Sequence, residues 1–281
     1  MSTGRIAFQG ELGANSHEAC VAAFPDMTPV PHATFVEAFE AIKSGDCQLG
    51  MIPVENSIAG RVADVHHLLP DSGLKIVGER FKPIHFQLMA NPGAKLEDIT
   101  TVASMPIALA QCRKVVRQLK LRTEPVGDTA LAAKLLSLNP DPTRAAISPA
   151  LAAELYGLDI LVRDIEDTDN NTTRFLIMTA EAQPPAPDHS RPCMTSFVFR
   201  VRNLPAALYK AMGGFATNGV NLTKLESYME NGAFTATVFY AEVDGRPEDQ
   251  GVALAFEELQ FFSERFEILG VYPADPFRDR G

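Results

Sequence analysis

Residues 167–178, DTDNNTTRFLIM, hold the side chains whose types and spacing are best suited to chemistry. A polar half, NNTTR at 170–174, passes directly into an apolar half, FLIM at 175–178. Asn and Asp favour turns whereas Thr, Phe and Ile favour strands, so a loop should enter a sheet here. The hydroxyl of Thr173 and the planar donor fork of Arg174 would then suit a small carboxylic acid. A surface salt bridge at a strand edge is the alternative.

A second polar group, Glu55-Asn56-Ser57, follows the apolar residues 51–54 and precedes Gly60. Side chains at the carboxyl end of a buried strand face the ligand in open α/β sheets. Asn56 and Ser57 could bond carboxylates or a keto oxygen. Glu55 could supply an acid if burial raised its pKa, or orient its neighbours if it were ionised. Capping of the next helix is the alternative role for this group.

The elements that must position these groups alternate short apolar strands with amphipathic helices, which is typical of an α/β sheet. Residues 6–8 are expected to form the first strand, followed by a helix over 16–24 that Ser16 caps. Thr34 is expected to cap the next helix, and residues 49–54 form a buried strand. Further strands lie within 74–90, and the pattern predicts helices from Pro106 and over 129–138.

Residues 182–193, AQPPAPDHSRPC, contain four prolines and no periodicity, which indicates a linker. The chain beyond it reads as a ferredoxin-like βαββαβ domain, with Asn231-Gly232 as a hairpin turn. The expected elements are strand 195–202, helix 205–217, strand 221–229, strand 233–243, helix 248–262 and strand 265–272.

Composition limits the possible functions. With 281 residues, 46% hydrophobic and 21% charged, the chain has the composition of an ordinary soluble protein of two domains. Its four cysteines are scattered, and the N-terminal residues have neither a signal peptide nor a membrane span, so we expect a cytoplasmic protein with reduced thiols. A net charge of −10 argues against nucleic acid. An anionic substrate would therefore need a local positive pocket, from Arg174 or helix N-termini.

Thr173-Arg174-Phe175 resembles the Thr-Arg-Phe signature of prephenate dehydratases, and further matches follow in the expected order over nearly the whole chain. They include the glycine turn in 6–19, the Pro-Val-Glu-Asn-Ser segment in 52–69, and segments at 104–112, 128–133 and 145–158. Residues 203–227 resemble the ACT regulatory domain that follows the catalytic part in this family. Met105-Pro106-Ile107 stands where the family usually has His-Pro-Gln, so any polar role there is absent.

The resemblance implies an α/β fold with two lobes of the periplasmic-binding-protein type and an active site in the cleft between them. Residues 1–80 and the strand after Thr173 would form one lobe, and residues 81–165 the other. The expected domains are the catalytic domain 1–181, the linker 182–193 and the ferredoxin-like βαββαβ ACT domain 194–273.

The resemblance also implies a reaction, the loss of carbon dioxide and hydroxide from prephenate to give phenylpyruvate, without a metal or organic cofactor. Thr173 would donate a hydrogen bond to the departing oxygen, and Arg174 would hold a substrate carboxylate. Glu55, Asn56 and Ser57 complete the expected catalytic group, and Phe175 is interpreted as packing. Second-rank substrate contacts are Ser16, His85, Thr129, Ser148 and Asn171.

ACT domains of this family bind phenylalanine, the end product of the pathway, between paired domains, which implies a homodimer or homotetramer. The expected effector residues are Leu204, Ala206, Ala207, Leu208, Asn221, Leu222, Thr223, Glu226 and Ser227. The family's Gly-Ala-Leu appears here as residues 206–208, Ala-Ala-Leu, and its Glu-Ser-Arg-Pro as residues 226–229, Glu-Ser-Tyr-Met. We hypothesise that phenylalanine still binds, with altered affinity or selectivity. An ACT domain used for oligomerisation alone is the alternative.

Taken together, the sequence predicts a monofunctional prephenate dehydratase in phenylalanine biosynthesis, with no chorismate mutase domain before its first strand. An arogenate dehydratase, which performs the same elimination on the amino analogue, is the nearest alternative. A non-catalytic amino-acid sensor with binding-protein-like lobes is an alternative of another class.

Overall fold

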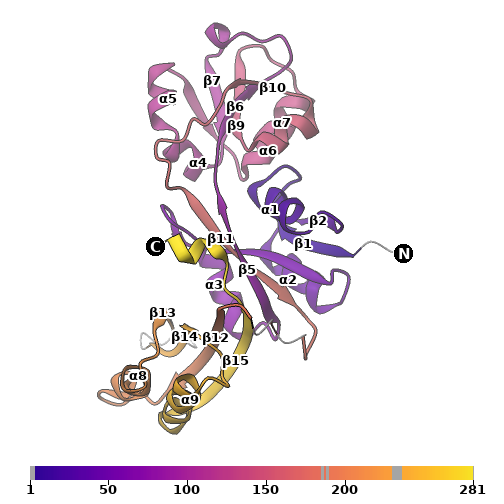
Figure 1. Ribbon diagram of the computed structural model, residues 1–281. Helices are drawn as coiled ribbons and strands as arrows, with labels where there is room; N and C mark the ends of the chain where they lie inside the picture. Colours follow the sequence, from indigo (N-terminus) through magenta and orange to yellow (C-terminus); the bar gives the residue numbers. More distant parts are fainter. Residues whose placement is uncertain (1–3, 185–186, 188–189, 230–235, 281) are drawn as a thin grey trace. The chain divides into compact units, whose positions relative to one another are not determined.

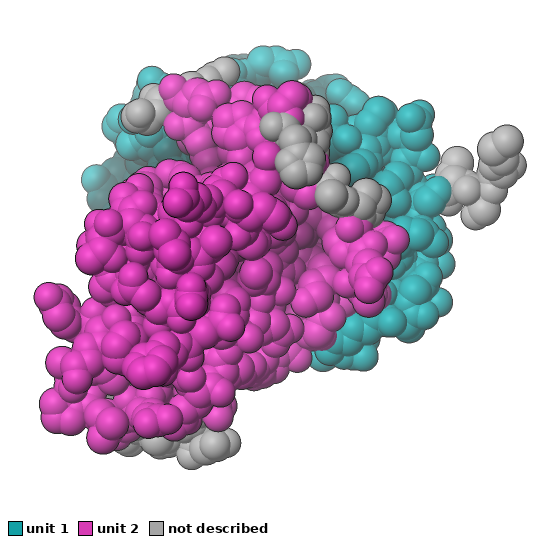
Figure 2. Space-filling view, turned by 60° about the horizontal axis from the view of Figure 1, so that its bottom comes forward, with its two compact units in different colours: residues 1–65, 80–175 teal, residues 66–79, 176–281 magenta. Residues whose placement is uncertain are grey.

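The structure, a computed structural model, describes residues 4–184, 187, 190–229 and 236–280 (Figure 1). The chain forms two compact units, shown in different colours in Figure 2: residues 1–65 with 80–175, and residues 66–79 with 176–281. The strands β5 (Lys75–Pro83) and β11 (Thr172–Thr179) each run from one unit into the other. The predicted limits of the catalytic domain, linker and regulatory domain stay predictions. The compact units divide the chain differently, because residues 66–79 belong to the same unit as residues 176–281.

The first sheet has the strand order β2-β1-β3-β11-β5, with the short strand β4 paired to β3. Strand β1 is parallel to β2 and to β3, and the chain moves from β1 to β2 and back past β1 to β3. Right-handed crossovers in these two directions place α1 and α2 on opposite faces. The bounds are β1 (Arg5–Gln9), α1 (Asn15–Ala23), β2 (Thr28–His32), α2 (Phe35–Lys43), β3 (Leu49–Asn56), β4 (Gly60–Arg61), α3 (Ala63–Leu68) and the 3-10 turn η1 (Leu69–Asp71).

The two predicted helix caps have different outcomes. Thr34 caps α2 as predicted, because its side chain accepts a hydrogen bond of 3.1 Å from the Glu37 N–H. The prediction that Ser16 caps the first helix is wrong. The extended residue before α1 is Ala14, which has no capping side chain, so Ser16 already lies inside the first helical turn.

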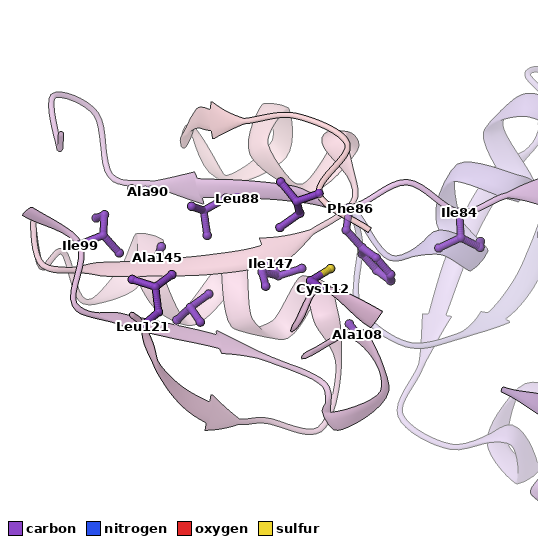
Figure 3. Packing of buried hydrophobic residues seen from close by; sticks show 12 residues of the cluster. Ile84, Phe86, Leu88, Ala90, Ile99, Ala108, Cys112, Leu121, Ala145 and Ile147 are labelled. Carbon is purple, nitrogen blue, oxygen red and sulfur yellow. The ribbon is translucent and has the colours of Figure 1, made fainter. Parts of the chain in front are cut away.

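The second sheet has the order β10-β6-β9-β7-β8, with β7 parallel to β8 and β9, and β6 antiparallel to β9. Figure 3 shows side chains of β6 and β9 meeting Ala108 and Cys112 in a buried hydrophobic core. The predicted helix 129–138 is confirmed as α6. The bounds are β6 (Gln87–Ala90), the 3-10 turn η2 (Leu96–Asp98), β7 (Thr101–Ser104), α4 (Pro106–Gln111), α5 (Arg113–Gln118), β8 (Arg122–Pro125), α6 (Thr129–Leu138), β9 (Arg144–Ser148), α7 (Ala150–Tyr156) and β10 (Asp159–Val162).

The third sheet belongs to the unit of residues 66–79 and 176–281, and it confirms the predicted βαββαβ order. It is antiparallel, with the strand order β13-β14-β12-β15. Its helices pack on it through a cluster that includes Phe197, Phe215 and Phe256. The bounds are β12 (Cys193–Val201), α8 (Ala207–Thr217), β13 (Leu222–Met229), β14 (Ala236–Asp244), α9 (Gln250–Phe262), β15 (Ser263–Pro273) and the 3-10 turn η3 (Pro276–Arg280). The predicted Asn231-Gly232 hairpin lies outside the described residues, as do four residues of the predicted linker.

Two further properties follow from burial. All four cysteines are buried free thiols, and burial raises the pKa of Cys20 to about 12, which keeps that thiol protonated and unreactive. In the described part of the chain, no helix combines the length and apolar character needed to cross a membrane.

Candidate functional site

Thr173 meets the second predicted polar group through Asn56. Asn56 is the last residue of β3, and Thr173 is the second residue of the neighbouring strand β11. The amide Nδ2 of Asn56 donates to Thr173 Oγ1 over 3.0 Å. Because the Thr173 oxygen accepts this bond on a lone pair, its own O–H proton can be donated to a third group. Asn56 therefore orients Thr173 as a hydrogen-bond donor.

Asn56 is itself fixed by further hydrogen bonds. Its Nδ2 also lies 2.7 Å from Asn171 Oδ1, and its Oδ1 accepts from the N–H groups of Ile58 and Ala59. Asn171 is buried and donates in turn to Gln111 Oε1, which lies on α4 beside the second sheet. This chain of amides holds the Thr173 hydroxyl in place from both sheets. Gln111 was not among the residues predicted from sequence.

Ser57 stabilises the same junction through the backbone. Its hydroxyl donates to Asn170 O over 2.5 Å and accepts from the Thr172 N–H over 2.9 Å. Its own N–H donates to Thr172 O. With both hydroxyl functions used by the loop before β11, the side chain of Ser57 fixes this loop in the described conformation.

Arg174 and Glu55 form a separate pair on the other side of the first sheet. Arg174 Nη1 lies 3.0 Å from Glu55 Oε1, and the guanidinium lies 5.7 Å from the centre of the Phe81 ring on β5. Successive residues of a strand point to opposite faces, so Glu55 and Arg174 face away from Asn56 and Thr173. The side chain of Arg174 is only 2% exposed. The structure thus does not bring the guanidinium and the Thr173 hydroxyl to one face.

The second-rank residues are distributed over both sheets. Ser16 and Thr129 are buried in the first turns of α1 and α6. Ser148 ends β9 and is 0% exposed, and its Oγ has no hydrogen-bond partner in the described part of the chain. Asn15 Oδ1, at the start of α1, is also a buried atom with no hydrogen-bond partner among the described residues. Buried polar atoms are almost always bonded, so both atoms are suited to a ligand or a water molecule.

Two contacts join the starts of the helices that carry these atoms. The Leu151 N–H of α7 donates to Glu18 Oε1 of α1 over 3.2 Å. Gly13, in the turn before α1, has a φ of +93°, and a Cβ there would lie 2.8 Å from Ala152 Cα. Glycine is therefore required for α1 to approach α7 this closely. Asn15 and Ser148 stand at two helix starts that pack together.

Asp128 is a structural residue of this region that the sequence interpretation missed. Its Oδ1 accepts from the N–H groups of Ala130 and Leu131 and so caps α6. Burial raises the pKa of its carboxyl, although these two N–H groups act in the opposite direction. Its position immediately before a helix rich in Ala and Leu was the available signal.

His85 belongs to a group of polar side chains at the start of β6. Its Nδ1 lies 2.6 Å from Glu166 Oε1, while Glu166 Oε2 accepts from the Phe86 N–H. Asp164 accepts from Gln87 Nε2. His85, Asp164 and Glu166 bring metal-ligand atoms within 4.8 Å of one another, but two of the three are exposed and each acid already accepts a hydrogen bond. The group is explained by these internal bonds.

The predicted effector residues lie in two segments, one at the start of α8 and the other on β13 with the residue before it. Asn221 Nδ2, just before β13, donates to Asp244 Oδ2 over 2.7 Å. Thr223 Oγ1 donates to Glu242 O on β14. Tyr228, the residue that replaces the arginine of the resembled motif, stacks on His66 of α3 with ring centres 4.0 Å apart. An aromatic contact within the compact unit thus occupies this position.

The start of α8 carries backbone strain. Ala206 precedes the helix with a φ of +61° in the left-handed region, at the position where the resembled motif has glycine. This conformation costs an L-residue roughly 1–2 kcal/mol, whereas the extra flexibility of glycine in the unfolded chain costs about 0.5–1 kcal/mol.

We therefore expect Ala206→Gly to increase the free energy of unfolding by about 0.5–1 kcal/mol. Urea unfolding followed by circular dichroism measures the change. Ala216→Gly, inside α8, is the matched control and should decrease stability by roughly the same amount. If both substitutions destabilise the protein, Ala206 is not strained.

A cavity of about 740 Å³ lies elsewhere, between α6 and the strands β7 and β9. Its lining includes Ala103, Val126 and Leu136 and none of the predicted site residues. The chemistry-bearing group is therefore defined by its hydrogen bonds around Thr173.

Comparisons with known proteins show which family the chain resembles. The sequence profile of the family described as prephenate dehydratase matches residues 6–183. A protein of Komagataeibacter europaeus described as a bifunctional N-acyl-homoserine lactone acylase/prephenate dehydratase is 48% identical over 276 residues, which cover 97% of each chain. Arogenate dehydratase 2 of Petunia hybrida is 36% identical over 285 residues, covering 96% of this chain and 72% of the petunia protein.

Solved structures are also similar over nearly the full length, and one of them contains a bound amino acid. It is the prephenate dehydratase of Arthrobacter aurescens in complex with L-Phe, with a TM-score of 0.86 and 30% sequence identity. The match covers 96% of this chain and 90% of that chain.

Proposed function

This chain belongs to the prephenate dehydratase family of carbon–oxygen lyases, and on that premise we propose that it converts prephenate to phenylpyruvate in phenylalanine biosynthesis, in the cytoplasm. The observation that carries the proposal is the hydrogen bond from Asn56 Nδ2 to Thr173 Oγ1. It leaves the hydroxyl proton of Thr173 available to the oxygen that departs from the substrate ring.

The reaction breaks two bonds and makes an aromatic ring. The carbon–carboxylate bond breaks to release carbon dioxide, its electron pair enters the ring, and the carbon–oxygen bond on the opposite ring carbon breaks. The departing oxygen becomes negative, so a hydrogen bond from Thr173 stabilises the transition state more than the ground state. A threonine hydroxyl is a very weak acid, so we assign it hydrogen-bond donation during departure and no full proton transfer beforehand.

The substrate carboxylates require donors in a protein whose net charge is −10. Arg174 faces away from Thr173 and is paired with Glu55, so we assign the pair to fixing β3 against β11. We propose that the N–H groups at the start of α1, together with Ser148 and Asn15, receive a carboxylate. The buried, unbonded hydroxyl of Ser148, which can donate, and the uncapped start of α1 support this role. Asn15 would contribute its amide Nδ2, because its Oδ1 can only accept.

We further propose that residues 194–273 form an ACT domain that binds phenylalanine as an inhibitor, in a homodimer or homotetramer. The βαββαβ order and the L-Phe complex of the Arthrobacter aurescens relative support the proposal. The Tyr228–His66 stack is expected to shape the effector site in place of the arginine of the resembled motif.

Arogenate is the alternative substrate, because the petunia relative carries that name. An acylase activity is a separate alternative, prompted by the name of the Komagataeibacter europaeus relative. Thr173 Oγ1 is bonded to an amide, whereas an acyl-transfer nucleophile needs an adjacent base. This difference supports the dehydratase reaction at Thr173.

The proposal predicts turnover of prephenate to phenylpyruvate by the purified full chain, with lower turnover when phenylalanine is added. Phenylpyruvate absorbance measures the rate with prephenate. Arogenate and an N-acyl-homoserine lactone are assayed in parallel by chromatography of their products, phenylalanine and homoserine lactone. Turnover of arogenate alone would show that arogenate is the substrate in place of prephenate, with the same elimination reaction. No elimination of either compound by the folded protein would reject the enzymatic proposal and favour an amino-acid sensor.

A further inference from the structure

A buried ionic group stands outside the site described so far, within the unit of residues 66–79 and 176–281. Glu79 on β5 is 0% exposed and Glu242 on β14 is 1% exposed. Arg278, on the C-terminal turn η3, places Nε 2.6 Å from Glu79 Oε1 and Nη2 2.9 Å from Glu79 Oε2. Its Nη2 also lies 3.4 Å from Glu242 Oε2. One guanidinium therefore holds two buried carboxylates from two strands.

The rest of the group completes the hydrogen bonding of these carboxylates. Glu79 also accepts from the Asp275 N–H over 3.0 Å, and Glu242 accepts from the Tyr240 hydroxyl over 2.5 Å. The Tyr240 hydroxyl continues to Ser196 and from there to Tyr272. A buried carboxylate is tolerated when it has an ion-pair partner and hydrogen-bond donors. This network therefore fixes the side chain of Arg278 in one conformation.

Glu242 connects the group to β13, the strand that carries four of the nine predicted effector residues. It lies opposite Lys224 of β13 in the antiparallel pair, and its carbonyl accepts from Thr223 Oγ1. A shift of β13 on effector binding would therefore act on Glu242 directly.

The first half of β5 is fixed to the same sheet by independent contacts. Lys75 Nζ donates to Ile268 O on β15 over 3.1 Å. A Cβ at Gly270 would lie 2.0 Å from Ile76 O, so β15 approaches β5 at a distance that glycine alone permits. Residues 75–79 are thus held at three points, Lys75, Ile76 and Glu79.

The second half of β5 reaches the catalytic strands. Phe81 lies two residues beyond Glu79 and, as a strand neighbour at i+2, shares its face. The guanidinium of Arg174 lies over the Phe81 ring, and Arg174 pairs with Glu55 beside Asn56. Glu79 and Phe81 are joined by the backbone of one continuous strand, and this backbone is the path by which a displacement at Glu79 would reach Phe81.

We propose that Arg278 is a positioning residue, which clamps β5 to the C-terminal sheet and so sets the position of Phe81 beneath Arg174. The proposal rests on the dehydratase function assigned above for its effect on turnover. Its structural part, the transmission along β5, is independent of that function.

Hydrogen exchange of the full chain tests the transmission, with wild type, Arg278→Met and Arg278→Lys compared by mass spectrometry. In Arg278→Met we expect exchange to rise at least about fivefold at residues 80–83 and 172–175, and in Arg278→Lys by less, since the charge remains but the bidentate fork is lost. Arg202→Met is the matched control, because Arg202 makes a surface ion pair with Glu264 at 3.8 Å. It should leave both segments at wild-type exchange.

Kinetics supply the second readout. Arg278→Met should lower kcat for the elimination about fivefold or more with a smaller change in KM, and should weaken inhibition by phenylalanine by a similar factor. If Arg278→Met fails to fold, Glu79→Gln/Arg278→Met takes its place, because it also removes the charge of the carboxylate that the guanidinium holds with two bonds.

The outcomes separate the two proposals. Faster exchange confined to residues 75–79 and 275–280, with 80–83 and 172–175 unchanged, would overturn the role of Arg278, whatever the activity. A wild-type protein that eliminates neither substrate would overturn the proposed function, while the exchange pattern would still decide the positioning role.

Discussion

Replacing Thr173 with alanine is expected to lower kcat for the elimination about a thousandfold, which corresponds to roughly 4 kcal/mol in the activation free energy. The substitution removes the O–H that stabilises the departing oxygen. The fold should tolerate it, because Asn56 Nδ2 keeps Asn171 Oδ1 and Thr172 O as acceptors at 2.7 and 3.3 Å. The free energy of unfolding should change by about 1 kcal/mol or less.

Steady-state kinetics with prephenate, together with thermal unfolding with and without substrate, measure both effects. Thr173→Ser restores a hydroxyl and should regain activity to within about tenfold of wild type, whereas Thr173→Val keeps the shape without the hydroxyl and should stay inactive. Thr172→Ala is the matched control, since its side chain faces the other side of β11 and its carbonyl is unchanged. If Thr173→Ala and Thr172→Ala lose activity equally, a local distortion is the cause and the hydroxyl has no special role.

Local patterns predicted much of this fold. The alternation of strands and helices, the cap at Thr34, the helix from Thr129 and the βαββαβ order all depend on residues close in sequence. The prediction that Ser16 caps the first helix was wrong by two positions, because α1 starts at Asn15 and the residue at its cap position is Ala14. Capping is decided by backbone geometry that residue type alone does not fix.

The contacts of the site depend on strand pairing between distant segments. Neither Asn56 nor Thr173 reveals from its own neighbours that β3 lies beside β11, so their bond required the sheet order. The alternation of side chains along β11 directs Arg174 and Thr173 to opposite faces, and the pairing with β3 places Glu55 beside Arg174. Tyr228 and His66 are also far apart in sequence, and their stacking depends on tertiary packing. The sequence therefore indicated which residue types could carry the chemistry. Which of these side chains contact one another could be seen only in the folded structure.

Substituting Arg174 distinguishes a substrate-binding cation from a structural one. We expect Arg174→Lys to lower kcat about tenfold to a hundredfold with KM within about twofold, because the ion pair with Glu55 positions β3 and β11 and does not touch the substrate. Lysine lacks the planar fork and loses the stacking on Phe81, so the free energy of unfolding should fall by about 1–3 kcal/mol.

Glu55→Gln is the variant that decides between these roles. If the ion pair acts by positioning, this substitution should reproduce the fall in kcat, since it weakens the same contact from the other side. If Arg174 instead binds a substrate carboxylate, Arg174→Lys should raise KM by about tenfold or more, and Glu55→Gln, which weakens the ion pair but keeps the guanidinium, should not. Arg122→Lys controls for a general Arg-to-Lys effect, because Arg122 is 75% exposed and pairs with Glu124 at the surface. If KM rises in Arg174→Lys alone, Arg174 binds the substrate, and a second conformation must exist in which its side chain separates from Glu55.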